Sequence, residues 1–353
     1  MARTSNIGLD IGTTAIRAAE LSFGSGGPGK SNASLTAYAQ VPLPLGAVQD
    51  GEVVDVGAVA TAIKTLWSEA KFTSKDVNMG VANQRVIVRE ADLPWQPVEQ
   101  LKKTLPYQAE QLLPTGVGDA VYDFVPTGEF ESMEGKFVSG LFVAAIREMV
   151  MNNAEAVQRG GLSPVMVDFN PLAIQRALTQ GELRNHTVAL VDVGARITNL
   201  VIAERGIPRF VRVLPNGGQE ATDAVASTLG VAREQAERIK RETGVGIPVS
   251  QDRAHIADAV FTATSNLIAA IRSTFVYYSS KALGAPIDAV VLTGGAAGLE
   301  GFGQYLSSTV RLPVQMGNPL DQVKVSRGVN MDALRGNEYA ATVAIGLAYG
   351  VAE

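Results

Sequence analysis

The chain has 353 residues, a formal net charge of −5 and no cysteine. Disulfides, thiolate metal sites and cysteine nucleophiles are therefore excluded, and the lack of a long basic run argues against nucleic acid as the main partner. The length suffices for two domains or two halves. Residues 1–6 lack the apolar core of a signal peptide. The apolar stretch 340–352 is too short to span a bilayer, so we expect a cytoplasmic protein.

Apolar periodicity in the first part of the chain predicts a strand meander, a helix and two further strands, at 7–11, 15–22, 35–41, 56–71, 77–82 and 85–91. Residues from about 84 to 165 differ in texture. They contain a helix around Leu101 and Leu105, paired strands at 122–125 and 136–145, and a helix at 147–159. This region therefore reads as a small α+β insertion.

The second half begins near residue 188. Its pattern predicts helices at 218–229, 232–243 and 253–283. A buried strand at 289–293 then runs into Gly294-Gly295, and a helix at about 338–350 closes the chain. The strand at 289–293 and the glycine pair directly after it, followed by a helix, form a pattern that is typical of a turn facing a ligand.

An internal repeat is the most informative feature of the chain. Residues 7–17 and 188–202 each read as an apolar strand, an Asp-x-Gly turn, a Thr and a second apolar strand. Such a repeat predicts two related half-domains that face each other. Glycine lets the backbone come close, turn N–H groups face an anion, and aspartate can hold a hydrated cation. A single Asp-x-Gly is more often a simple hairpin, but the matched pair favours a phosphate or metal site.

These turns, together with Thr293-Gly294-Gly295, resemble the three nucleotide-binding loops of the actin-like ATPase superfamily. Within it the chain is most similar to the PilM family of the type IV pilus machinery, with FtsA as a relative. The resemblance implies an α/β, actin-like (ribonuclease H-like) duplicated fold with an inserted α+β subdomain. The implied boundaries are 1–83, 166–187 and about 335–353 for domain I, 84–165 for the insertion, and 188–334 for domain II.

The resemblance also implies ATP and Mg²⁺ in the cleft between the halves. Asp10 and Asp192 would orient the metal and are two of the catalytic candidates, and Asn170 at the first hinge is the third.

 The water shell of the metal would stand between the ion and both carboxylates. Contacts to phosphate, ribose and base are expected from Gly12, Thr13, Thr14, Arg17, Gly194, Thr198, Glu237, Lys240, Arg241, Gly294 and Gly295.

Several of these positions have a second interpretation. Glu237, Lys240 and Arg241 share one helix face, which also suits an exposed salt-bridge group. Arg17 alternates with apolar neighbours and could face solvent. His186 and His255 are isolated, so no histidine base or metal cluster is expected.

The chain also departs from the superfamily pattern. Arg196 stands in the second phosphate turn where relatives have Asp or Gly, and it would either contact phosphate or crowd the turn. Asn170 stands where chaperone ATPases carry a Glu that positions the attacking water. An amide can orient water but cannot take up its proton, so we expect ATP binding with slow or no hydrolysis, at most a weak ATPase.

Three functions are compatible with these residues. The first is a cytoplasmic ATP-binding adaptor of type IV pilus biogenesis, held at the inner face of the plasma membrane by a partner and without direct membrane insertion. The second is an FtsA-like division protein, although FtsA anchors itself through a C-terminal amphipathic helix that this chain lacks at its end. The third is a small-molecule kinase, for which Asp168 is the only candidate base at the hinge.

The adaptor interpretation implies a peptide partner. We expect the N-terminal tail of a PilN-like membrane protein, besides other pilus assembly proteins and no nucleic acid. The tail would dock as an extended segment in a groove between the insertion and the first half. Leu93-Pro94-Trp95 and Leu112-Leu113-Pro114 offer apolar residues that could line that groove. The alternative is that they simply pack the insertion against its neighbour, which for any one residue is the more frequent outcome.

Overall fold

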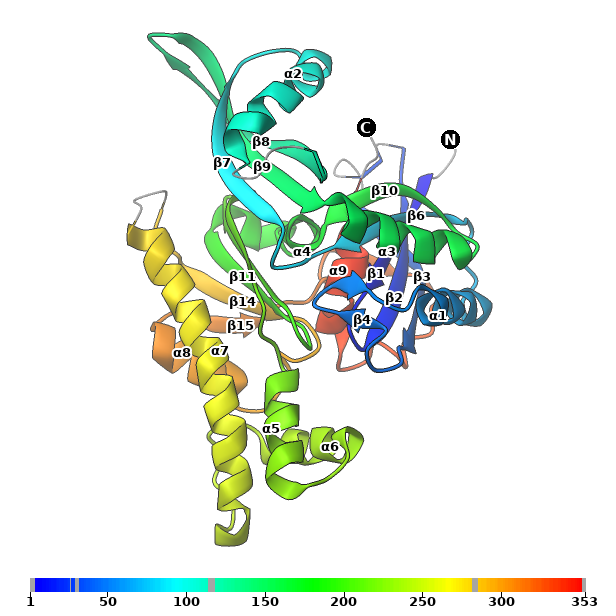
Figure 1. Cartoon of the computed structure of the whole chain (residues 1–353), viewed down its shortest axis with the longest axis vertical. Helices are drawn as coiled ribbons and strands as arrows, with labels where there is room; N and C mark the ends of the chain where they lie inside the picture. The colour runs from blue at the N-terminus through cyan, green and yellow to red at the C-terminus, as the bar shows by residue number, and fades with distance from the viewer. Residues whose placement is uncertain (1–3, 26, 29–31, 114–117, 281–284, 351–353) are drawn as a thin grey trace.

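The computed structural model describes residues 4–25, 27–28, 32–113, 118–280 and 285–350. Two sheets stand side by side with helices between and around them, and the inserted part rises from one end (Figure 1). The two ends of the described chain lie close together beside the first sheet.

The first sheet has six strands in the order β10-β6-β1-β2-β3-β16. Three of them form an antiparallel meander: β1 (Thr4–Ile11), β2 (Ala15–Phe23) and β3 (Ala33–Pro42). The other three run parallel to their neighbours: β6 (Asp76–Val81), β10 (Ser163–Phe169) and β16 (Val323–Val325). The predicted meander is thus confirmed.

The second sheet repeats this plan in the order β13-β12-β11-β14-β15. Its meander is β11 (Thr187–Val193), β12 (Thr198–Glu204) and β13 (Ile207–Leu214). Its parallel strands are β14 (Ala289–Thr293) and β15 (Val314–Met316). The order matches β3-β2-β1-β6-β10 of the first sheet strand for strand, which confirms the duplicated α/β fold predicted from the repeat.

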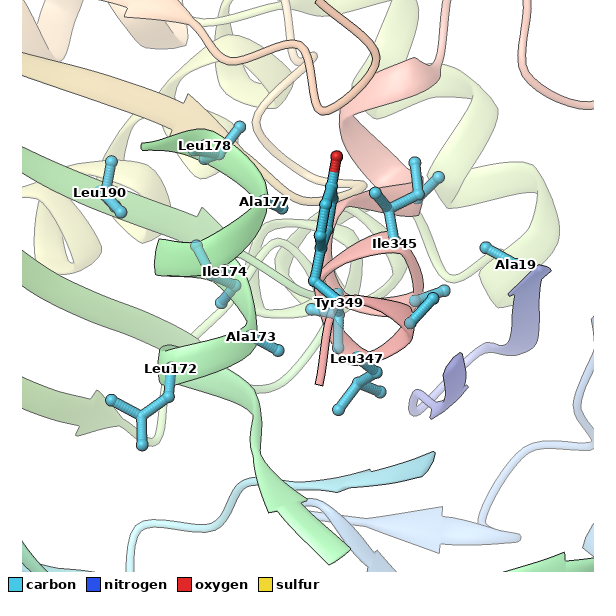
Figure 2. Packing of buried hydrophobic residues seen from close by; sticks show 14 of the residues in the cluster. Ala19, Leu172, Ala173, Ile174, Ala177, Leu178, Leu190, Ile345, Leu347 and Tyr349 are labelled. Atoms are coloured by element: carbon cyan, nitrogen blue, oxygen red, sulfur yellow. The ribbon is translucent and has the colours of Figure 1, made fainter. Parts of the chain in front are cut away.

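Two helices pack in the space between the sheets, α4 (Asn170–Leu178) and α9 (Thr342–Ala348). Figure 2 shows their apolar side chains facing each other, with Ala19 of β2 on one side and Leu190 of β11 on the other. Small residues let the helices approach closely. A Cβ on Gly346 would lie 1.9 Å from the carbonyl oxygen of Ala173. This helix pair therefore joins the two halves through one continuous apolar core.

The outer faces carry the remaining long helices. On the first sheet these are α1 (Val56–Glu69) and α3 (Arg147–Arg159). On the second half they are α5 (Gln219–Leu229), α6 (Arg233–Thr243), α7 (Ala254–Ser280) and α8 (Phe302–Val310). Short pieces complete the chain: β4 (Val48–Gln49), β5 (Glu52–Val53) and the 3₁₀ turns η1 (Gly181–Asn185), η2 (Gln251–Arg253) and η3 (Glu338–Ala341).

In the described part of the chain, one helical segment is long and apolar enough by length and composition to cross a membrane, Gln251–Ser280. Of the most apolar 18-residue stretch of this segment, 33% is buried inside the structure. The buried residues, among them Val260, Leu267 and Ile271, pack on α5 and the second sheet, as those of a core helix do.

The inserted part forms its own three-stranded sheet, with the order β7-β9-β8, and its own apolar cluster. Its elements are β7 (Ile87–Pro94), α2 (Val98–Leu112), β8 (Ala120–Ser132) and β9 (Gly135–Ile146). The helix that follows, α3, packs on α1 and on the first sheet instead. Residues 147–165 of the expected insertion therefore lie against the first half, and β16, expected in domain II, pairs with β3.

The residues predicted to line a peptide groove lie elsewhere. Leu93 and Leu113 are 3% and 6% exposed and pack inside the cluster of the insertion, together with Leu101 and Phe124. Trp95 is exposed, with its ring beneath the Lys136 ammonium, and Pro114 falls outside the described residues. The groove interpretation was wrong for the two leucines because an isolated three-stranded sheet needs a covering helix. Leu93 on β7 and Leu113 just after α2 are buried in the apolar cluster that the sheet and this helix share.

Candidate functional site: the cleft between two Asp-x-Gly turns

The two hairpin turns of the repeat have the same construction. Gly12 donates its backbone N–H to the carbonyl of Ala15 at 3.1 Å, and Gly194 donates to that of Ile197 at 2.9 Å. A Cβ on Gly12 would come within 3.0 Å of its acceptor oxygen, and one on Gly194 within 2.7 Å. Both turns are therefore too tight for a larger residue, as a backbone cradle for an anion requires.

Both aspartates end a buried strand beside these turns. Asp10 is 7% exposed and Asp192 is 6% exposed. Burial raises the pKa of Asp10, against the pull of the nearby Arg17 guanidinium. Burial also raises the pKa of Asp192, to about 6, with a hydrogen bond from Asn199 opposing it and the charge of Asp10 adding to it. The two carboxylates therefore lie close enough for the charge of Asp10 to raise the pKa of Asp192, as expected for two matched turns that face each other.

Arg17 faces Asp10 and is largely shielded from solvent. Its Nη1 lies 3.7 Å from Asp10 Oδ2, and its side chain is 16% exposed. On the far side, a Cβ on Gly295 would lie 3.9 Å from Nη2. The guanidinium thus spans the distance from the first turn to the third, where it can meet an anion held between them.

The third turn, after β14, is tied to the second. Gly294 has φ of +88°, a conformation that favours glycine. A Cβ there would lie 2.7 Å from Asp192 Oδ1 and 2.5 Å from the Val193 carbonyl oxygen. Its N–H donates to the carbonyl of Tyr339 in the turn η3, at 3.1 Å. The structure thereby brings the second and third predicted loops and the turn η3 together.

The three predicted residues on α6, Glu237, Lys240 and Arg241, differ in their burial and partners. Lys240 is 6% exposed and donates to Glu237 Oε2 at 2.7 Å, to Thr222 Oγ1 at 3.0 Å and to the Gly218 carbonyl at 3.2 Å. Burial lowers the pKa of Lys240, against the stabilising effect of Glu237. Lys240 also lines a small cavity next to the third turn. Arg241 is exposed and pairs with Glu237, which is the salt-bridge interpretation for that residue.

Two residues, Thr198 and Arg196, make contacts other than those expected. The Thr198 hydroxyl donates to the Asn216 carbonyl at 2.8 Å, so it supports the turn from behind. Arg196 pairs with Asp223 on α5 at 3.0 Å, and Asp223 also holds Arg233 on α6. Arg196 therefore ties the second turn to the helices. Thr13 and Thr14 stand at the tip of the first turn, with Thr14 exposed.

The first hinge holds Asn170 and Asp168. Asn170 Oδ1 is buried against Gly80, where a Cβ would lie 2.0 Å from it. Asp168 forms an ion pair with Arg176 and accepts the N–H of Phe169. The single base candidate for a kinase is therefore already engaged. His186 and His255 are exposed, as expected.

Sequence reasoning missed one segment of the site, Gly217-Gly218 at the start of α5. Gly218 donates to the Gly194 carbonyl at 2.9 Å, and a Cβ on Gly217 would lie 2.5 Å from the carbonyl oxygens of Gly194 and Ala195. The glycine pair at the beginning of the predicted helix 218–229 was the signal that would have found it.

The residues present fit a hydrated Mg²⁺ with a nucleotide. Among the described residues no group of three or more His, Cys, Asp or Glu side chains gathers to hold a metal. Mg²⁺ keeps several waters and is commonly bound through one or two carboxylates together with substrate phosphates. Asp10 and Asp192 provide the two carboxylates, and the glycine turns provide close backbone for the phosphates.

Comparison with known proteins identifies solved structures of similar fold. A chain of the PilM-PilN type IV pilus biogenesis complex is 27% identical, with a TM-score of 0.83 and coverage of 100% of both chains. MreB5 of Spiroplasma citri, solved bound to ADP, has a TM-score of 0.51 at 13% identity, covers 97% of this chain and 94% of its own, and shows the fold alone.

Among curated proteins, cell division protein FtsA of Streptococcus pneumoniae is 25% identical over 265 residues, which is 68% of this chain and 56% of FtsA. The chain thus spans about half the length of the curated relatives it matches. The family model described as type IV pilus assembly protein PilM matches residues 8–350. With the duplicated actin-like fold and its three turns, this match shows that the chain belongs to the PilM family of type IV pilus assembly proteins.

Proposed function

We propose that the chain is an ATP-binding adaptor of type IV pilus biogenesis that a PilN-like protein recruits to the membrane. It hydrolyses ATP slowly or not at all. The family match over residues 8–350 supports the pilus role over the division role of FtsA. The nucleotide and the partner are argued separately below.

One observation is the main support for nucleotide binding. Two buried side-chain atoms beside the two carboxylates have no hydrogen-bond partner, Arg17 Nε and Asn199 Oδ1, and a third, Asn170 Oδ1, lies at the first hinge against Gly80. Elsewhere in the described part of the chain there are two more such atoms, on Asp223 and Tyr278. An unpaired buried polar atom costs about 1–3 kcal/mol. Phosphate oxygens and the waters of a hydrated cation supply the missing acceptors and donors, and the ADP-bound MreB5 neighbour has the same fold.

The hinge supports binding over turnover. Asn170 is an amide, which cannot take up a proton from water at neutral pH. Asp168 is held by Arg176. Neither residue offers a free carboxylate base to an attacking water or to the hydroxyl of a kinase substrate.

The first test is a thermal shift with ATP and Mg²⁺. A ligand at about a hundred times its Kd stabilises the folded state by roughly 2.7 kcal/mol, so the unmutated protein should melt at a higher temperature. Asp10→Ala should abolish the shift because it removes one of the two carboxylates. Asp258→Ala, an exposed carboxylate on α7, is the control and should respond like the unmutated protein. No shift at millimolar ATP-Mg²⁺ would contradict nucleotide binding.

The partner is argued from the related complex and from an open strand edge. A chain of the PilM-PilN type IV pilus biogenesis complex matches this chain over its full length. In the first sheet, β10 is an edge strand, and two of its side chains are exposed, Val165 by 51% and Val167 by 42%. An extended peptide can add to such an edge through main-chain hydrogen bonds, while alternate side chains pack on the strand. We place the PilN-like tail here, next to the insertion.

Calorimetry with a synthetic N-terminal tail of the PilN-like protein tests this. We expect binding that drops at least tenfold in the double variant Val165→Glu, Val167→Glu, because the carboxylates would have to be desolvated beneath the peptide. The matched control is Met316→Glu on β15, the equivalent edge strand of the second sheet and 46% exposed. It should bind normally. Undetectable binding by the unmutated protein at high micromolar peptide would remove the adaptor role, and equal loss in both variants would remove only the β10 site.

A further inference from the structure

The two hairpins with the Asp-x-Gly turns differ in the residue that faces each carboxylate. The strand register sets Asp10 opposite Arg17 in β1–β2, and Asp192 opposite Asn199 in β11–β12. Arg17 and Asn199 therefore occupy equivalent places in the duplicated fold. The first carboxylate faces a cation, whereas the second faces a neutral amide and keeps its negative charge uncompensated by its cross-strand neighbour.

The amide fixes the Asp192 carboxylate in one orientation. Asn199 Nδ2 donates to Asp192 Oδ2 at 3.0 Å. Asp192 Oδ1 lies on the other side, against the backbone of Gly294. Asn199 is 5% exposed, so the contact is shielded from water. The reversed amide would set two acceptor oxygens against each other, which is unfavourable.

The other half of the same amide has no partner. Asn199 Oδ1 is buried and makes no hydrogen bond to any described residue. Asn78 is an equally buried amide, at 5% exposed, and serves as a comparison. Its Nδ2 donates to the carbonyls of Leu347 and Gly350, and neither of its amide atoms is among the unpartnered ones. Backbone carbonyls thus use the donor half of the Asn78 amide, whereas Asn199 donates to a charged carboxylate and has a buried acceptor left over.

We propose that Asn199 is the positioning residue for a hydrated divalent cation at Asp192. Its Nδ2 holds the carboxylate and its Oδ1 accepts a hydrogen bond from a water bound to the cation. Partners that orient a metal-binding carboxylate in this way typically contribute 10–100-fold in metal affinity. The inference rests on the proposed nucleotide function, because the phosphates of the nucleotide complete the shell of the cation.

The experiment separates the cation from the nucleotide. Thermal shifts are recorded with ADP in EDTA and with ADP at increasing Mg²⁺ concentrations. For the unmutated protein, Mg²⁺ should add to the shift given by ADP alone. In Asn199→Leu, similar in size but without the amide, the Mg²⁺ concentration for half of this increment should rise at least tenfold. The shift with ADP in EDTA should stay as in the unmutated protein.

Two further variants keep the result interpretable. Asn199→Thr retains a hydroxyl donor and should recover part of the Mg²⁺ response even if Asn199→Leu folds poorly. Asn78→Leu should lower the melting temperature of the ligand-free protein but leave the half-maximal Mg²⁺ concentration unchanged. An Asn199→Leu protein with normal Mg²⁺ dependence, or with equal losses in EDTA and in Mg²⁺, would overturn the inference. No shift with any nucleotide in the unmutated protein would instead contradict the proposed function itself.

Discussion

Asp192→Asn is expected to make the ligand-free protein more stable at neutral pH by about 3 kcal/mol. Burial raises the pKa of this carboxyl from 3.8 to about 6, and each unit corresponds to about 1.4 kcal/mol. The folded state binds the proton more tightly than the unfolded chain, so the destabilisation is absent below about pH 4. It grows as the pH rises from about 4 to 6 and is complete above that range. Asparagine cannot ionise and removes the penalty.

Urea denaturation of both proteins across this pH range measures the effect. The two unfolding free energies should agree near pH 4 and separate up to about pH 6. Asp258→Asn removes an exposed carboxylate on α7 and should give a difference that is small and nearly independent of pH. A stability gain for Asp192→Asn that is the same at pH 4 and pH 7 would contradict the explanation, since only the ionised carboxylate carries the penalty.

The same substitution should weaken the response to Mg²⁺ and nucleotide, because it removes the charge that faces the cation. A residue that destabilises the free protein and is needed for the ligand is typical of a functional site. Asp192 thus links the stability of the ligand-free protein to the chemistry proposed for the site.

The second large effect is expected from Gly346→Ala in α9. The new methyl carbon would lie 1.9 Å from the carbonyl oxygen of Ala173 and 2.4 Å from its carbonyl carbon. Both are backbone atoms of α4, so the two helices must move apart. Overpacking of this kind costs about 1–3 kcal/mol and occasionally more, and here it exceeds the gain of up to about 1 kcal/mol in helix propensity. We expect a loss of about 3 kcal/mol in the free energy of unfolding.

Gly303→Ala in α8 is the matched control. A Cβ at Gly303 would have its nearest neighbours at 3.6 and 3.8 Å, which is ordinary van der Waals contact. This variant should be as stable as the unmutated protein or slightly more stable. Urea unfolding of both variants checks the comparison. If Gly346→Ala unfolds at the same urea concentration as Gly303→Ala, the close approach of α4 and α9 is not a constraint on the fold.

The sequence by itself determined the duplicated plan and its two carboxylates. Asp10 and Asp192 each follow a buried strand and precede a glycine turn, and this is a local pattern that backbone geometry imposes within about ten residues. The repeat of that pattern predicted the duplicated fold, because two hairpins with the same apolar pattern bury the same faces. The resemblance of Thr293-Gly294-Gly295 to a third loop then located the cleft.

Only the tertiary structure decided which side chains face each other across that cleft. Strand register and helix packing decide three of these features: the burial of Lys240, the pairing of Arg196 with Asp223, and the contact of Asn199 with Asp192. The same holds for Leu93 and Leu113, which read as groove residues in the sequence and are core residues in the insertion. An apolar residue can be buried by its own subdomain or by a partner, and the sequence pattern is identical in both cases. The choice is made by contacts between segments far apart in the chain, which local periodicity does not record.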